Sequence, residues 1–150
     1  FLTFTDSANE IKIKYPSGWT KNKDLKGIII TFDSPKENAS DKVQENLNVI
    51  KDELPAQTTL DQYIDLSTNQ AKQSIEDFKL TNSSKITLAG NPARKLTFTG
   101  KSNKHNLKWL QIVAEKNNKI YALTYTAEAS KYSKFLGNIQ KMIDSFEITQ

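Results

Sequence analysis

The clearest β-hairpin in the chain is LKWLQIVAEKNNKIYALTYTA, residues 107–127. Two runs rich in β-branched and aromatic residues, 107–115 and 119–127, flank Asn117-Asn118. Asparagine tolerates the positive φ angles that a type I′ turn requires at both central positions. Tyr121 and Tyr125 share one face of the second run because side chains alternate along a strand, so we expect them to pack in the core. The stretch therefore predicts two paired antiparallel strands.

Shorter strands are predicted on the amino-terminal side of this hairpin. Alternating or β-branched runs indicate strands at 10–15, at 27–32, from about 45 to just before Pro55, at 85–88 and at 93–99. Ala89-Gly90-Asn91-Pro92 is typical of a tight turn, and residues 36–43 and 101–106 are polar and are expected to form loops. Pro16-Ser17-Gly18 breaks the first strand, and the following Trp19 is expected to cover an edge of the core.

Two segments have helical periodicity. Thr59-Leu60-Asp61-Gln62 has the form of a capping box and opens a helix over about 60–77. Ser130 is the expected N-cap of a second helix, whose apolar residues from Tyr132 to Phe146 recur at helical spacing. We expect a short strand at 146–149 after it.

These elements predict the fold class. Two helices and about seven strands, joined mostly by hairpin-length loops, indicate a mainly antiparallel central sheet. The central strands carry apolar residues on both faces, so we expect a helix on each face. The prediction is an α+β protein with an α-β-α sandwich, and 150 residues are enough for one domain, 1–150.

The composition limits the kinds of chemistry that are available. The chain has no cysteine and a single histidine, His105, in the polar stretch 101–106. We expect this histidine to be solvated rather than a general base. The sequence has no glycine-rich phosphate loop and no G-x-S-x-G elbow, and no apolar run approaches the ~20 residues that cross a bilayer. We therefore expect a protein that is not an enzyme.

Charge is distributed unevenly between the two halves. Residues 1–77 have a net charge of −4 and residues 78–150 have a net charge of +8, and 20 of the 21 basic residues are lysine. Because arginine is the usual bidentate phosphate ligand, this composition argues against nucleic-acid binding. The densest basic cluster is Arg94, Lys95, Lys101, Lys104 and Lys108, which strand pairing is expected to bring together. It could dock to an acidic protein partner or to anionic membrane headgroups, or it could serve only solubility.

Asp61 and Asp65 are the candidate metal ligands. Their i, i+4 spacing places both carboxylates on one face of the first predicted helix, where they could bind a hard cation. Carboxylates near the start of a helix also complement its dipole, so both interpretations remain open. The residues themselves indicate no cofactor.

A set of short motifs follows in a definite order along the chain. They are Tyr15-Pro16-x-x-Trp19, the strand 27–32, Asn46-Leu47-Asn48-Val49, Thr59-Leu60-x-x-Tyr63, the segment 90–96, Leu110-Gln111-x-x-Ala114, the segment 118–125 and Met142-Ile143-x-Ser145-Phe146. Together they resemble the PsbP-like proteins, which are extrinsic subunits at the oxygen-evolving side of photosystem II and their non-photosynthetic relatives. The resemblance extends over nearly the whole chain.

The resemblance implies an antiparallel sheet between helices and a non-catalytic role in assembling or stabilising a membrane complex. In photosynthetic members that role includes retention of calcium and chloride, but no metal-binding residue of those members matches a position here. The family resemblance and a first residue, Phe1, that is not Met together imply an extracytoplasmic protein, secreted or lipid-anchored on the cell envelope. We expect a monomer. The alternative function is a small-molecule or lipid carrier with a pocket between sheet and helix.

Overall fold

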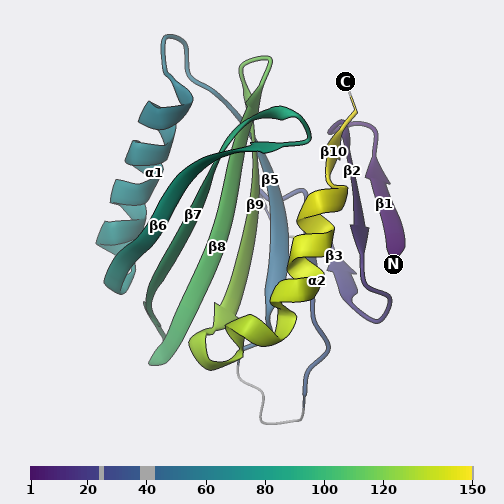
Figure 1. Ribbon diagram of the computed structural model, residues 1–150, viewed down its shortest axis with the longest axis vertical. Helices are drawn as coiled ribbons and strands as arrows, with labels where there is room; N and C mark the ends of the chain where they lie inside the picture. Colours follow the sequence, from purple (N-terminus) through teal and green to yellow (C-terminus); the bar gives the residue numbers. More distant parts are fainter. Residues whose placement is uncertain (24–25, 38–42, 150) are drawn as a thin grey trace.

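The computed structural model describes residues 1–23, 26–37 and 43–149 (Figure 1). Its elements follow in the order β1 (Leu2–Asp6), β2 (Ile11–Tyr15), β3 (Thr20–Asn22), β4 (Ile30–Asp33), β5 (Asn46–Glu53), α1 (Leu60–Ser74), β6 (Glu76–Leu88), β7 (Asn91–Ser102), β8 (His105–Lys116), β9 (Lys119–Glu128), the 3₁₀ turn η1 (Ala129–Lys131), α2 (Tyr132–Ser145) and β10 (Glu147–Ile148).

The strands form two antiparallel sheets. The large sheet has seven strands in the order β3-β4-β5-β9-β8-β7-β6, and the small sheet has three in the order β1-β2-β10. The predicted α+β sandwich and the large antiparallel sheet are confirmed. The predicted strand 10–15, however, lies in the small sheet and pairs with β1, which the sequence did not indicate. Alternation shows which face of a strand is buried but does not show which strand lies beside it.

β8 and β9 form the predicted central hairpin. They pair from Leu107 opposite Glu128 to Lys116 opposite Lys119, and both turn residues, Asn117 and Asn118, have positive φ angles, of 53° and 61°. Tyr121 and Tyr125 are 0% exposed, as expected for core residues.

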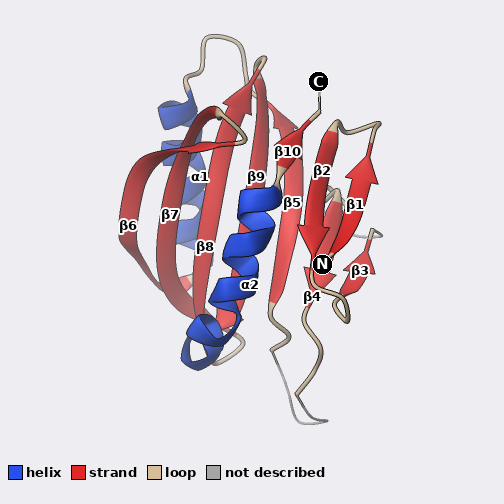
Figure 2. Ribbon diagram, turned by 45° about the vertical axis from the view of Figure 1, so that its right-hand side comes forward, coloured by secondary structure: helices blue, strands red, loops and turns tan. Residues whose placement is uncertain are grey.

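Different elements pack on the two faces of the large sheet, as Figures 1 and 2 show. On the face that we call the α2 face, α2 and the small sheet pack together over the strands. On the opposite face, the α1 face, a smaller apolar cluster lies beneath α1. Trp19 belongs to the α2 side, is 8% exposed and meets the Phe135 ring edge-on at 6.0 Å, which confirms its predicted place at the edge of the core.

Local chemistry explains where α1 begins. Thr59 Oγ1 accepts a hydrogen bond from the Gln62 amide at 3.1 Å, and Gln62 Oε1 accepts one from the Thr59 amide at 2.9 Å. The predicted capping box is therefore present. The N-cap of α2 was predicted wrongly: Ser130 lies in η1, and the N-cap residue is Lys131, with no side-chain capping bond. A 3₁₀ turn often precedes an α-helix and satisfies part of its first turn without a side chain.

The prediction was also wrong around the end of α1. The helix stops at Ser74 rather than at residue 77, and β6 runs from Glu76, although a strand was predicted only at 85–88. β6 is the edge of the large sheet and most of its residues are exposed, so it lacks the alternation that marks a half-buried strand.

The expected loop at 101–106 is a tight hairpin turn. β7 continues to Ser102 and β8 begins at His105, with Asn103 and Lys104 between them at φ angles of 51° and 68°. The strand ends at an exposed hairpin turn are polar, so they show no apolar alternation and are not predicted as strand. The other expected loop, 36–43, falls mainly on residues 38–42, which lie outside the described residues.

Candidate functional site

The structure divides the predicted basic cluster between the two ends of the large sheet. We call the end with the turn Asn103–Lys104 and the start of α2 the lower end, and the end with the turns Ala89–Gly90 and Asn117–Asn118 the upper end (Figure 1). Lys101, Lys104 and Lys108 lie at the lower end. Arg94 pairs with Val113 and Lys95 with Ile112, far along the same hairpin, so the expectation that all five residues gather was wrong. In an antiparallel hairpin only residues equidistant from the turn become neighbours.

The lower end keeps three of the five basic residues, which we call the basic end. Lys101 and Lys104 are exposed, and Lys101 Nζ lies 3.5 Å from the Asp77 carboxylate. Lys108 Nζ lies 4.3 Å from the centre of the Tyr132 ring, so its charge also packs on an aromatic face. Lys101 and Lys104 are therefore the most exposed members of the basic end.

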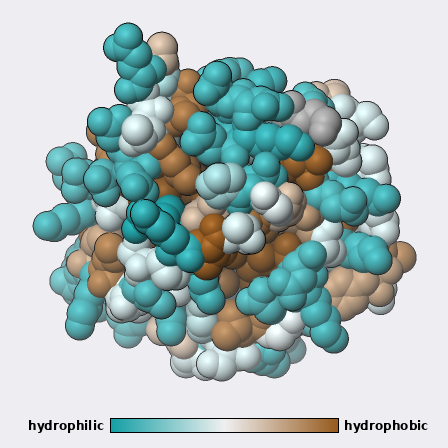
Figure 3. Space-filling view, turned by 45° about the horizontal axis from the view of Figure 1, so that its top comes forward, coloured by the Kyte–Doolittle hydropathy of each residue, from teal (hydrophilic) through white to brown (hydrophobic). Residues whose placement is uncertain are grey.

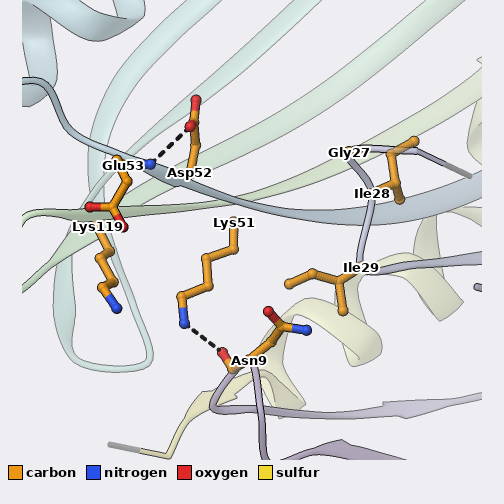
Figure 4. A pocket seen from close by; sticks show the side chains of 8 residues that line it. All are labelled: Asn9, Gly27, Ile28, Ile29, Lys51, Asp52, Glu53 and Lys119. Atoms are coloured by element: carbon orange, nitrogen blue, oxygen red, sulfur yellow. Dashed lines mark hydrogen bonds between the residues drawn. The ribbon is translucent and has the colours of Figure 1, made fainter.

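The upper end has the two larger of the hollows that the described residues line there; this end faces forward in Figure 3, where apolar surface shows between hydrophilic side chains. The first, the inter-sheet hollow, has a volume of about 500 Å³. It is lined by Asn9, Gly27, Ile28, Ile29, Lys51, Asp52, Glu53 and Lys119 (Figure 4). Its two lysines and two carboxylates balance in charge.

Lys51 is the most constrained cation of the inter-sheet hollow. Its side chain is only 15% exposed and its Nζ donates to the Asn9 carbonyl at 3.2 Å, as Figure 4 shows. The same ammonium lies 3.6 Å from Glu10 Oε1 and 5.5 Å from the centre of the Tyr121 ring. These contacts tie the β1–β2 turn to β5, so Lys51 links the small sheet to the large one.

The second hollow, the helix hollow, lies between the start of α1 and the β6–β7 hairpin and has a volume of about 520 Å³. It is lined by Thr59, Leu60, Asp61, Lys85, Ile86, Thr87, Gly90, Pro92, Ala93 and Arg94. Arg94 crosses it: Nη1 donates to Asp61 Oδ1 at 2.6 Å, and Nη2 donates to Ser83 Oγ at 2.5 Å. This bridge holds the start of α1 against β6 and β7.

The two candidate metal ligands have different surroundings. Asp61 is the ion-pair partner of Arg94, while Asp65 is exposed one turn further along α1. Within the described residues, no three His, Asp or Glu side chains gather in a group that could hold a metal ion. The guanidinium beside Asp61 competes directly with any cation at that carboxylate.

Burial raises the pKa values of three tyrosines, Tyr63, Tyr125 and Tyr132, and the first two also have acidic neighbours. Burial, followed by the hydrogen bond that its hydroxyl donates to Asp52 Oδ2 at 3.1 Å, raises the pKa of Tyr63 to about 12. Burial and then the charge of Glu45, a carboxylate with 0% exposure, raise the pKa of Tyr125. The Tyr125 hydroxyl donates to the Tyr132 carbonyl at 2.7 Å, which joins β9 to α2. Both phenols stay protonated at neutral pH and act as hydrogen-bond donors.

The whole-chain comparison identifies the family. The family model described as PsbP-like protein matches residues 1–148. The chain belongs to the PsbP-like protein family. None of the curated proteins matches the sequence significantly.

Solved structures share the fold of this PsbP-like chain. Cyanobacterial PsbP (CyanoP) from Synechocystis sp. PCC 6803 has a TM-score of 0.73 at 20% identity, over 98% of this chain and 91% of that one. LpqN of Mycobacterium tuberculosis has a TM-score of 0.72 at 14% identity, over 93% and 83%. The Ran-binding protein Mog1p of Saccharomyces cerevisiae has a TM-score of 0.67 at 10% identity, over 99% and 95%. At these identities the likeness establishes the fold alone.

Sequence reasoning missed the cations of the two hollows, Lys51, Lys85 and Lys119. Each lies in or beside a strand of this PsbP-like domain, and no spacing rule distinguishes it from the other lysines. The available signal was the turn at Ala89–Gly90, which places Lys85 opposite Arg94 once β6 and β7 are paired. Neither α1 nor α2, the helices of the described ranges, combines the length and apolar character needed to span a bilayer.

Proposed function

We propose that this PsbP-like chain is a non-catalytic binding and assembly domain on the outer side of a membrane, where it docks to a membrane-associated complex. The observation that carries the proposal is the family match over residues 1–148. Two similar structures support a role of this kind by their descriptions: LpqN is involved in cell envelope biogenesis and Mog1p is a Ran-binding protein.

The basic end is the docking surface in this proposal. Lys104 lies in the β7–β8 turn and Lys101 lies near the end of β7, and both are exposed, so an acidic partner can approach them without displacing any core residue. Exposed charges steer association over distances up to about 8–10 Å at physiological ionic strength, and salt weakens that attraction. Docking through this end therefore depends on salt.

The test is binding of the purified chain to membranes from the cells that make it, at low and high salt. The double variant Lys101→Glu/Lys104→Glu should slow association about tenfold at low salt. Lys14→Glu/Lys26→Glu, which makes the same charge change at exposed positions outside the basic end, is the matched control and should bind as the wild type does. Equal binding by the wild type and both variants at both salt concentrations would contradict docking through the basic end.

Protease treatment of the membranes separates the two kinds of partner. Loss of binding after proteolysis assigns a protein partner, which is the proposed case. Binding that survives proteolysis and still depends on Lys101 and Lys104 assigns the anionic lipid surface instead.

A second candidate function is a small-molecule carrier, and the helix hollow favours it. Its volume of about 520 Å³ lies within the range of roughly 300–1,000 Å³ that is usual for ligand pockets. Leu60 and Pro92 give it apolar walls between a helix and the sheet. Saturable binding of a small amphiphile by the isolated chain would support this function.

A further inference from the structure

We propose that the helix hollow binds a small, soluble amphipathic anion, with a negatively charged head group on an aliphatic body. This inference rests on the carrier function, the second candidate above, and names the class of its ligand. The argument depends on the charge of the hollow, on the contacts of Arg94 and on the apolar walls.

The charges of the hollow do not cancel. Lys85 on β6 lies directly opposite Arg94 on β7 in the antiparallel register. Like charges in such a pair destabilise the sheet. Asp61 is the one carboxylate that lines the hollow, and its Oδ1 lies 2.6 Å from Arg94 Nη1. Within the described part of the chain Lys85 has no ion-pair partner within 4.0 Å, so an anion beside it would relieve the repulsion.

Arg94 is held in place rather than free to move. Two of its nitrogens donate to Asp61 and Ser83, and its third, Nε, is buried without a hydrogen-bond partner among the described residues. The guanidinium therefore forms a fixed positive wall with one unsatisfied donor. Lys85 is exposed, and it is the residue that would contact the head group.

The lining of the helix hollow favours a ligand with an apolar body. Leu60 from α1 and Pro92 from β7 line the hollow, and it is bordered by Ile86 and Ala93, whose side chains belong to the apolar cluster of the α2 face. The inter-sheet hollow is an internal contrast, because it is similar in volume but its lining has two lysines and two carboxylates. Of these two hollows, the helix hollow is the one that combines a residual positive charge with a mainly apolar wall.

The experiment is a titration of the isotope-labelled chain with octanoate, octanol and octylammonium at neutral pH, followed by amide chemical shifts. The three probes share an eight-carbon body and differ in head-group charge. Octanoate should bind saturably and shift the amides of 59–61, 85–87 and 93–94, with octanol weaker and octylammonium weakest.

Lys85→Glu should weaken octanoate binding about tenfold, because a positively charged hydrogen-bond donor is replaced by a carboxylate that repels the octanoate carboxylate. Lys79→Glu is the matched control: it makes the same charge change in the same strand, opposite Thr99 and outside the hollow. It should leave the affinity for octanoate within about twofold of the wild type.

Three results would overturn the inference, and they are distinguishable. Equal affinities for octanoate and octanol would keep the carrier function and exclude selection for an anion. No shift with any probe would exclude both the carrier function and its ligand class. Equal losses in Lys85→Glu and Lys79→Glu would show that the whole strand attracts anions and that the hollow does not select them.

Discussion

The two faces of the large sheet are covered in different ways. The α2 face carries a helix and a second sheet, whose residues Ile11, Ile13, Ile139 and Met142 are 0% exposed. The α1 face carries one helix, in which Ile64 is the only buried residue, while Leu66 is 61% exposed. A hollow of about 210 Å³ remains beneath α1, lined in part by Tyr63 and Ile64. More apolar side chains are buried on the α2 face than on the α1 face, so we expect the α2 face to contribute more to stability.

Ile139→Ala should have the largest effect, because it empties part of the α2 face. The buried side chain has close-packed neighbours, so we expect a loss of about 2–5 kcal/mol in the free energy of unfolding. A urea titration monitored by circular dichroism measures it. Leu66→Ala on the exposed side of α1 is the control and should change stability by less than ~0.5 kcal/mol. A similarly small loss for Ile139→Ala would mean that α2 does not anchor the core.

Ile64→Ala tests the α1 face in the same way. The side chain is 4% exposed but already borders the hollow beneath α1, so fewer packing contacts are lost. We expect a loss of about 2 kcal/mol, near the lower end of the usual range for such truncations. The same urea titration gives the value. A loss equal to or greater than that of Ile139→Ala would break the comparison between the faces.

Thr59→Ala removes one half of the capping box at the start of α1. The Gln62 amide would lose its acceptor, and the expected loss is about 1 kcal/mol. Thr59→Ser keeps the oxygen and should restore most of this stability. Thermal unfolding of the two variants beside the wild type would measure the difference, and identical melting temperatures for Thr59→Ala and Thr59→Ser would show that the cap contributes nothing.

Tyr63→Phe should have the smallest effect at neutral pH and a distinct effect in alkali. An unfolded tyrosine has a pKa of 10.0, whereas the folded Tyr63 has a pKa of about 12. Below pH 10 the phenol of Tyr63 is protonated in both the folded and the unfolded state, so its contribution to the free energy of unfolding does not change with pH. Between pH 10 and 12 the unfolded state loses its proton first, so the free energy of unfolding falls as pH rises.

Denaturant titrations at pH 8 and pH 11 check this prediction. Tyr63→Phe should lose less stability between the two pH values than the wild type does. Tyr125, on the α2 face, also has a raised pKa and remains in the variant, so some alkaline loss should persist. An unchanged pH dependence would mean that the phenol of Tyr63 is not shielded from solvent on the α1 face.

Local patterns predicted the elements that depend on near neighbours. The Asn117–Asn118 turn, the Thr59–Gln62 capping box and the apolar stripe of α2 each depend on residues no more than four positions apart. Only the last four residues of the edge strand β6 were predicted, because the strand is exposed along most of its length and carries no hydrophobic period. Ser130 was an acceptable N-cap by residue type, but the chain enters α2 through a 3₁₀ turn instead.

The candidate sites depended on register, which the sequence did not contain. Arg94 and Lys95 are adjacent in sequence with Lys101, Lys104 and Lys108 nearby, yet the β7–β8 register separates the two groups. The same kind of pairing brings Lys85 to Arg94, and α1 then adds Asp61 from 33 residues away. No single-strand pattern carries that information.

The sequence by itself determined the fold class, the central hairpin, the two helices and the PsbP-like resemblance. These follow from side-chain periodicity, turn chemistry and the order of short motifs, all of which are local. Only the tertiary structure decided that the first predicted strand belongs to a second sheet, that the basic residues separate between two ends and that a hollow forms beside α1. The physical reason is that strand pairing and helix docking join residues far apart in sequence, and their free energy comes from burying several elements together.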